Sequence, residues 1–446
     1  MKKIAMVVLI ITVLCLSVFT VSCKKEAQQG GVIKVWVGAE SVAFYQKKAN
    51  EFISKTPNFG FTITVEGVDT GNAADTFLTD TTAGADIFTV AHDNLGKLIA
   101  GASAIGPITD QALLRQIQND NPQAFLNVIK GTVQGTEYTF GIPYIAQALV
   151  LYYNKAYLSD NDVKTWEGIV ARAAALGKQS LTLVGDDGYN NSFLVLASRE
   201  SDGTRAANLY EDGTLNSANF TSDLAAATMQ WGQRFFTNAN GGRRPSDSGW
   251  EIEFANERTL AIVSGAWHNS AASTALGSNM GIAILPNFTL SAEDVSGTNI
   301  PAGTVMRSGT FADTKMFVMK KYNTSNQAEA ARAAAVQQLL LFFSSKEVQE
   351  QSFIECDNLP AYKNASTEFA SIRNNLLART QIEMFSRGIA QPFGANAQMG
   401  GNYYGSGANG IVLDILINNG NQYGNTQQIK AALAVIQSLW RTGQRP

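Results

Sequence analysis

The feature that most limits the possible folds is an alternation of strand-like and helix-like segments that begins at residue 32. Short runs of apolar and β-branched residues predict strands at 32–37, 61–65 and 85–90, and then at 137–143 and 148–153. Between the first two runs, apolar residues recur at helical spacing from Tyr45 to Ile53. Strands separated by helices of this length indicate βαβ units, so we predict an α/β fold with mainly parallel sheets.

The later part of the chain is mostly helical. Helical patterns cover residues 219–237, 327–344, 346–354, 369–387, 411–418 and 426–441, and Thr165 is a favourable N-cap for an earlier helix. The 446 residues are 45% hydrophobic and 16% charged, which is typical of a globular chain with large cores. This length predicts more than one domain.

The first residues have the pattern of an export signal. Lys2 and Lys3 precede an uncharged apolar run, which ends at the segment Thr20-Val21-Ser22-Cys23. This segment resembles a lipobox, in which the cysteine is acylated and becomes the mature N-terminus, although Thr20 stands where leucine is usual. We therefore predict a signal peptide over 1–22, a lipid anchor on Cys23 and a polar tether over 23–31. The alternative is an ordinary secretory signal that ends at Ser22.

The three cysteines leave no internal disulfide for the mature protein. Cys15 lies in the leader, Cys23 is the candidate lipid site, and Cys356 remains alone. Cys356 stands in an apolar helical stretch, so we interpret it as a small buried hydrophobe rather than a nucleophile. The stability of the protein must then come from its cores.

Polar and aromatic residues follow three of the apolar runs. Residues 38–41 follow the first strand, residues 91–94 follow the third, and residues 265–267 follow the apolar run 260–263. In open α/β sheets, ligands bind beyond the carboxyl ends of the strands. These three loops are therefore the candidate ligand-binding segments.

At these loops the sequence resembles the maltose/maltodextrin-binding branch of the solute-binding proteins of ABC importers. The segments that carry the resemblance are GADIFTVAHDNLG at 84–96, IPYIAQALVLYYNK at 142–155, KTWEGI at 164–169, FANERTLA at 254–261 with GAW at 265–267, and GIAILP at 281–286. The resemblance implies a periplasmic-binding-protein-like fold, in which two α/β lobes are joined by a hinge and close on a ligand between them. It implies lobes formed by 32–146 with 307–362 and by 147–306 with 363–446.

The family's binding positions can be placed on this sequence. Glu40 and Asp93 fall where the family has acidic acceptors for sugar hydroxyls, Trp267 falls on a sugar-stacking tryptophan, and Gln147 stands where a carboxylate is found. Ser41 and Asn94 replace basic residues, and Val90 replaces a tryptophan. Further candidates are Tyr144 at the lobe crossing and Tyr403 and Tyr404 in the Gly/Asn-rich segment 394–410. The lost cations and tryptophan count against maltose itself.

These residue types suit a sugar. A carboxylate accepts two hydrogen bonds, which matches vicinal hydroxyls, and amides such as those of Asn94 and Gln147 both donate and accept. An indole such as that of Trp267 covers the apolar face of a pyranose. Each residue also has a structural interpretation: Asp93 as a helix N-cap, Glu40 on a solvated turn, Trp267 in a lobe core and Gln147 in the hinge. Trp36 is expected in the core.

The resemblance implies an exported protein on the extracytoplasmic face of the membrane, which binds a sugar or oligosaccharide and delivers it to a permease without acting as an enzyme. Two alternatives remain. One is a binding protein for an anionic solute such as glycerol phosphate, with Arg243, Arg244 or Arg307 as donors. The other is a glycoside hydrolase that uses Glu40 and Asp93. A structural adhesin fits the pattern less well.

Several other classes are disfavoured. The net charge of −3 with scattered basic residues argues against nucleic acid as a partner. His92 and His268 lack metal-ligand spacing, so we expect no metal site, and we expect no cofactor. The glycines of 405–410 match a dinucleotide fingerprint by letters, but no predicted strand precedes them. We expect a monomer.

Overall fold

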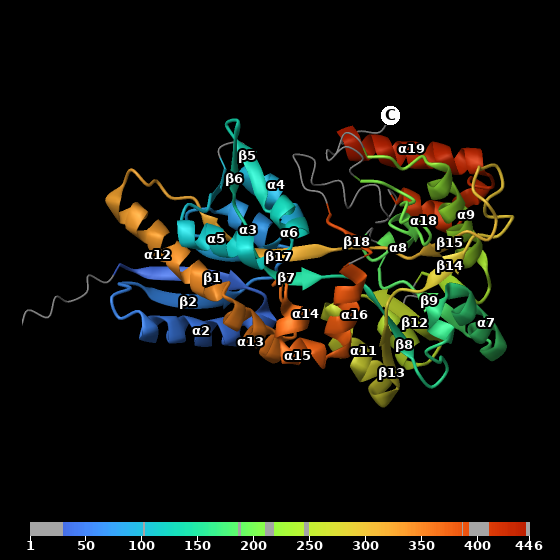
Figure 1. Ribbon diagram of the computed structural model, residues 1–446, viewed down its shortest axis with the longest axis horizontal. Helices are drawn as coiled ribbons and strands as arrows, with labels where there is room; N and C mark the ends of the chain where they lie inside the picture. Colours follow the sequence, from blue (N-terminus) through green and yellow to red (C-terminus); the bar gives the residue numbers. More distant parts are fainter. Residues whose placement is uncertain are drawn as a thin grey trace, which may run out of the picture.

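The computed structural model describes residues 30–100, 103–185, 189–209, 218–244, 249–385, 387–391 and 410–442. The predictions for Cys23, Tyr403 and Tyr404 concern residues outside these ranges. The chain forms two α/β lobes that lie end to end along the long axis (Figure 1). This arrangement confirms the predicted two-lobe architecture.

The first lobe is built on a six-stranded sheet with the order β2-β1-β3-β17-β4, in which β7 also pairs with β17. Its strands are β1 (Val32–Val37), β2 (Thr62–Gly67), β3 (Ile87–Ala91), β4 (Ile105–Gly106), β7 (Ile142–Gln147) and β17 (Asp313–Lys320). Its helices are α2 (Val42–Lys55), α3 (Ala73–Thr79), α4 (Leu95–Ile99), α5 (Gln111–Asp120), α6 (Gln123–Val128), α12 (Gln327–Phe343) and α13 (Lys346–Cys356). A hairpin of β5 (Lys130–Val133) and β6 (Thr136–Thr139) projects from this lobe.

The second lobe is built on a five-stranded sheet with the order β11-β9-β12-β8-β13. Its strands are β8 (Val150–Asn154), β9 (Gln179–Thr182), β11 (Gly242–Arg243), β12 (Thr259–Ser264) and β13 (Met280–Ala283). A small sheet joins β10 (Ser198–Arg199), β14 (Asn287–Thr289) and β15 (Val305–Arg307). The helices are α7 (Trp166–Leu176), α8 (Ser192–Val195), α9 (Asp223–Thr237), α10 (Gly249–Ala255), α11 (Asn269–Leu276), α18 (Ile411–Leu416) and α19 (Thr426–Thr442).

Both sheets are mixed, whereas the sequence predicted mainly parallel ones. β1 pairs in parallel with β2 and β3, but β17 is antiparallel to β3, β4 and β7. In the second lobe β8 is antiparallel to β12 and β13. The reason is topological, because β8 and β17 each enter their sheet directly from the other lobe and therefore run against the strands of the βαβ units.

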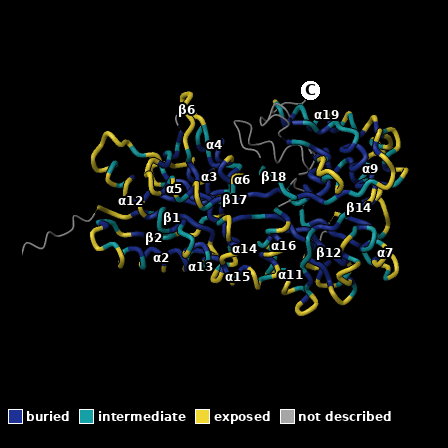
Figure 2. The backbone as a smooth tube through the Cα atoms, in the orientation of Figure 1, coloured by how far each residue is buried: buried dark blue, intermediate teal, exposed yellow. Residues whose placement is uncertain are grey.

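Two large cores stabilise the lobes, and the central strands β3, β8 and β12 are almost entirely buried (Figure 2). Trp36 is only 8% exposed and lies in the first core, as predicted. The second core extends to Phe311. Ala312 connects β16 (Thr310–Phe311) to β17 of the first sheet.

The helix boundaries follow local capping chemistry. The side chain of Thr165 accepts a hydrogen bond from Gly168 N at 3.1 Å, which confirms the predicted N-cap of α7. Ser222 and Asn326 cap α9 and α12 in the same way. The helix predicted over 369–387 is divided instead into α15 (Ala370–Arg373) and α16 (Leu376–Phe385), preceded by α14 (Ala365–Glu368). The helix of 346–354 is confirmed as α13.

Candidate functional site

The carboxyl edge of the first sheet gathers polar side chains from several strands. β1, β2 and β3 run in the same direction, so the loops that follow them leave at one edge. β7 shares this direction because both β7 and β3 are antiparallel to β17, and β17 therefore begins at that edge. We call this set of residues the first-lobe edge: Glu40, Asp69, Asp93, Asn94, Gln147, Asp313 and Lys315.

The second sheet presents its own carboxyl edge next to the first. β9 and β12 are parallel, and the last residue of β12, Ser264, pairs with the first residue of β8, Val150. Only Ala148 and Leu149 separate β8 from the end of β7. The first-lobe edge and the loop after β12 are therefore joined by short crossing segments, which is where ligands bind in open α/β folds.

Trp267 lies in the loop after β12 and is 42% exposed, so it is not a core residue. Its indole packs over Gly265, where a Cβ would lie only 2.0 Å from the ring. The Tyr189 ring lies 5.7 Å from the indole and stacks on Phe311 at 5.6 Å and 22°. We call Trp267, Tyr189 and Phe311 the aromatic cluster, in which the exposed indole packs on Tyr189 and Tyr189 on the buried Phe311.

Sequence reasoning found Trp267 but missed Tyr189 and Phe311. Tyr189 belongs to the long connection after β9, and Phe311 is the last residue of β16. Tyr189 would have been found by the same rule if β9 had been recognised, whereas Phe311 lies within β16 itself. These strands are only four and two residues long, too short for a periodic pattern.

Glu40 and Ser41 form the short η1 helix (Ala39–Ser41) directly after β1. Glu40 is exposed, and its carboxylate folds back over Gly38, where a Cβ would lie 2.3 Å from Oε1. Ser41 is buried, and its hydroxyl accepts a hydrogen bond from Asn358 Nδ2 at 3.1 Å. Glu40 is thus available to a ligand, while Ser41 fixes the loop to the segment after α13.

Asp93 does not act as an N-cap. Neither η2 (His92–Asn94) nor α4 has a side-chain cap. Its carboxylate accepts hydrogen bonds from Asn94 Nδ2 at 3.1 Å and from Gln391 Nε2 at 3.0 Å. Gln391 follows β18 (Gly388–Ile389), so a residue 298 positions away helps to orient Asp93. No pattern in the sequence predicts this partner.

A buried polar network lies under Asp93. Gln391 N donates to Asp313 Oδ1 at 2.8 Å, and Gln391 O lies 2.6 Å from His92 Nε2. The other ring nitrogen of His92 lies 3.3 Å from Thr314 O, so a neutral imidazole can donate to only one of the two carbonyls. Burial raises the pKa of Asp313 to about 6, with the charge of Asp93 acting in the same direction and the neighbouring His92 and the hydrogen bond from Gln391 N opposing it.

The family of the chain follows from a match over most of its length. Residues 47–375 match the family of bacterial extracellular solute-binding proteins. The chain belongs to this family. The protein is therefore an exported binding protein, and the polar edges and the aromatic cluster lie where two lobes of such a protein meet.

Solved structures share the fold of this solute-binding protein. A maltodextrin-binding protein from L. casei BL23, solved without ligand, has a TM-score of 0.71 at 21% identity, over 92% of this chain and 99% of that one. A cyclo/maltodextrin-binding protein complexed with maltotetraose has a TM-score of 0.68 at 20% identity, over 95% and 100%. The GacH receptor of Streptomyces glaucescens GLA.O has a TM-score of 0.66 at 16% identity, over 93% and 99%. The comparison with curated proteins finds no match.

The remaining sequence candidates of the binding protein lie at or behind the crossing. Tyr144 is 4% exposed and packs on Phe317 with ring centroids 4.3 Å apart, and its burial raises the pKa of the phenol above its usual value. In this structure Tyr144 is thus a core residue. Gln147 ends β7, is half-buried and lies opposite Asp313 in the strand register. Cys356 is half-buried, somewhat more exposed than expected.

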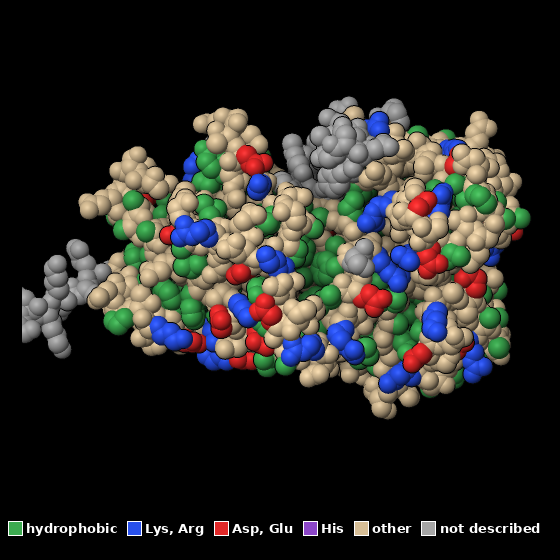
Figure 3. All heavy atoms as spheres, viewed as in Figure 1, with side chains coloured by type: hydrophobic (Ala, Val, Ile, Leu, Met, Phe, Trp, Pro, Cys, Tyr) green, Lys and Arg blue, Asp and Glu red, His purple; other side chains and the backbone are tan. Residues whose placement is uncertain are grey.

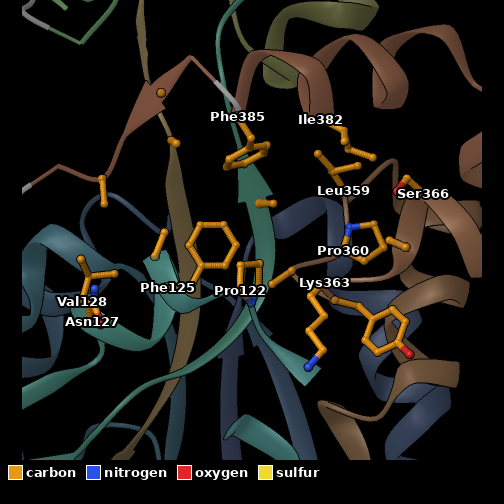
Figure 4. Close-up of a pocket in the computed structure, with 18 of the residues that line it drawn as sticks. Pro122, Phe125, Asn127, Val128, Leu359, Pro360, Lys363, Ser366, Ile382 and Phe385 are labelled. Carbon is orange, nitrogen blue, oxygen red and sulfur yellow. The ribbon is translucent and has the colours of Figure 1, made fainter. Parts of the chain in front are cut away.

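A separate apolar pocket of about 980 Å³ lies on the opposite face of the crossing strand β7. Ala146 lines it, whereas the next residue, Gln147, belongs to the first-lobe edge, and neighbouring side chains of a strand point to opposite faces. Figure 4 shows Phe125 of α6 and Phe385 of α16 on its walls, and their ring centroids lie 5.7 Å apart. With mostly apolar walls, this pocket has few groups that could bind sugar hydroxyls.

The described part of the chain offers no group of three or more His, Cys, Asp or Glu side chains that could hold a metal ion. Among the helices that the structure describes, none combines the length and apolar character that crossing a membrane requires. Figure 3 shows acidic and basic side chains interspersed over the visible face, without a stripe of one sign.

Proposed function

We propose that this solute-binding protein captures a neutral sugar or oligosaccharide of the maltodextrin type between its lobes. It would deliver the sugar to the permease of an ABC importer without acting as an enzyme. One observation carries the proposal: an exposed indole on one lobe edge lies across a short crossing from exposed carboxylates on the other. An aromatic face and hydrogen-bonding carboxylates are the two surfaces that a pyranose requires.

The comparisons support the same ligand class. Three solved structures with this fold are a maltodextrin-binding protein, a cyclo/maltodextrin-binding protein with maltotetraose, and a receptor solved with acarbose. The proposed lobes are 32–146 with residues from Ala312 to 362, and 147–311 with 363–446. Closure of these lobes would exclude water and strengthen each hydrogen bond to the ligand.

The alternative of an anionic solute is less well supported. Arg243 pairs with Glu253 at 2.6 Å, and Arg307 lies 3.5 Å from Glu200. Two of the three arginines that could recognise a phosphate are therefore engaged by carboxylates. An anionic ligand would bind less tightly as salt is added, whereas a neutral sugar would be nearly insensitive.

A thermal-shift screen tests the proposal. Maltose, maltotriose, maltotetraose, monosaccharides and glycerol 3-phosphate are each added to the purified mature protein. A ligand at about a hundred times its Kd stabilises the folded state by about 2.7 kcal/mol, so a maltodextrin should raise the Tm by several degrees. A shift with glycerol 3-phosphate alone would favour the anionic alternative, and release of reducing ends would favour a hydrolase.

We further propose that Cys23 is lipidated and that the polar segment 24–31 tethers a monomer to the membrane. The leader with its closing cysteine supports this assignment. In cells, Cys23→Ala should move the protein from the membrane fraction to the soluble fraction. A variant that stays in the membrane fraction would contradict it, and light scattering of the soluble form tests for a monomer.

A further inference from the structure

Lys315 lies at the centre of the first-lobe edge. It is the third residue of β17 and pairs with Ala91, the last residue of β3, and with Ile145 of β7. The loop that carries Asp93 begins directly after Ala91. The backbone of Lys315 is therefore held between two strands that end at the proposed sugar site.

The ammonium of Lys315 lies among carboxylates but forms no bond with them. Glu40 and Asp69, from the loops after β1 and β2, act on its charge, while partial burial lowers the pKa of the ammonium. Within the described ranges, no carbonyl or carboxylate lies within hydrogen-bonding distance of this group. The lysines at the other edge of the sheet differ, because Lys34 donates to Ala83 O and Lys320 to Thr82 O.

An unpaired, partly buried ammonium is unfavourable until a ligand oxygen reaches it. The other charged groups of this edge can only accept hydrogen bonds, because carboxylates have no protons to donate. The amides of Asn94 and Gln391 already donate to Asp93. A sugar hydroxyl both donates and accepts, so a site that binds it well needs donors beside its carboxylates.

We propose that Lys315 is a ligand-binding residue that donates hydrogen bonds to hydroxyl oxygens of the bound sugar, while Glu40 accepts from the same or neighbouring hydroxyls. This inference rests on the proposed function and makes it more specific. The carboxylates of Glu40, Asp69 and Asp93 outnumber the Lys315 ammonium. This edge of the site therefore selects a neutral diol and disfavours an acidic sugar. Lys315 thereby supplies a cation at this edge, where Ser41 and Asn94 stand in place of basic residues.

Isothermal titration with maltotetraose tests this role. Lys315→Met keeps the length and apolar stem of the side chain but removes the charge and the donors. It should weaken binding at least about tenfold, because carboxylates alone cannot satisfy the hydroxyl lone pairs. Lys315→Gln, which keeps an amide donor, should recover part of the affinity. Lys320→Met is the matched control, since Lys320 lies on the same strand, is also half-buried and is at the far edge.

The outcomes separate this inference from the proposed function. If the wild-type protein binds maltotetraose and Lys315→Met binds it equally well, the role of Lys315 is wrong and the sugar site stands. If the wild-type protein binds glycerol 3-phosphate and Lys315→Met does not, the assignment to neutral hydroxyls is wrong. If no sugar of the screen binds the wild-type protein, both proposals fail together. The Tm of the unliganded variants, unchanged or raised, excludes unfolding as the cause of weaker binding.

Discussion

Gln391 Nε2 donates a hydrogen bond to Asp93 Oδ2 at 3.0 Å, and thereby links the strand segment after α16 to the loop after β3. The backbone of the same residue contacts Asp313 and His92. The Asp93 carboxylate thus uses one lone pair for Gln391 and one for Asn94, and its other lone pairs stay available to a ligand.

Replacement of Gln391 should weaken sugar binding through Asp93. Gln391→Ala removes the donor and should reduce affinity by about fivefold, roughly 1 kcal/mol for one lost positioning hydrogen bond. Gln391→Glu places a second carboxylate beside Asp93 and should reduce it further. Titration calorimetry measures both, and Gln422→Ala, on an exposed turn, is the control. Equal affinity in all four proteins would exclude a positioning role.

Loss of the exposed indole should weaken binding without unfolding the protein. Trp267→Ala removes the apolar platform of the proposed site and should raise the Kd more than about tenfold. The Tm of the unliganded protein should change little, because 42% of this residue is already exposed. Tyr138→Ala provides a matched control, since Tyr138 is 40% exposed on the distant β5–β6 hairpin. An unchanged Kd for Trp267→Ala would remove the indole from the site.

A methyl group at position 265 should displace the same indole without altering it chemically. The Cβ of Gly265→Ala would lie 2.0 Å from Trp267 Cζ3, a distance that requires the ring to move. We expect several-fold weaker sugar binding and a changed tryptophan fluorescence spectrum. Gly424→Ala meets only the end of a side chain at 3.8 Å and serves as the control. An unaltered spectrum for Gly265→Ala would show that the loop absorbs the methyl group.

The stability of the protein should depend on pH through Asp313. Its pKa is raised from 3.8 to about 6, so the folded protein holds this proton more tightly than the unfolded chain. The stabilising contribution is complete below about pH 4 and is lost as the pH rises through 6, with an upper bound of about 3 kcal/mol. Asp313→Asn keeps an oxygen acceptor for Gln391 N but cannot ionise.

The difference in Tm between Asp313→Asn and the wild-type protein should therefore grow in favour of the variant from about pH 4 to about pH 6 and then level off. Thermal unfolding followed by circular dichroism at several pH values measures this difference. Two parallel curves would mean that Asp313 titrates equally in the folded and unfolded states. At each pH the variant is the reference for the wild-type protein, so the titration of groups that do not interact with Asp313 cancels.

The sequence by itself determined the local elements and the three loops that carry the candidate residues. β-Branched runs predicted β1, β2 and β3, and the rule that ligands bind beyond strand ends selected the loops 38–41, 91–94 and 265–267, because both depend on neighbouring residues in the chain. Within these loops the resemblance to the family singled out Glu40, Asp93 and Trp267. Thr165 as an N-cap and Trp36 as a core residue follow from the same local chemistry.

Only the tertiary structure decided which distant residues complete the site. The contacts of Gln391 with Asp93, of Tyr189 with Trp267 and of Asn358 with Ser41 join segments from 78 to 317 positions apart. Lys315 is half-buried at the edge because β17 enters the sheet antiparallel from the other lobe, which the alternation of strands and helices does not predict. Such pairings depend on how the lobes are threaded together, whereas propensity and periodicity report only on each segment alone.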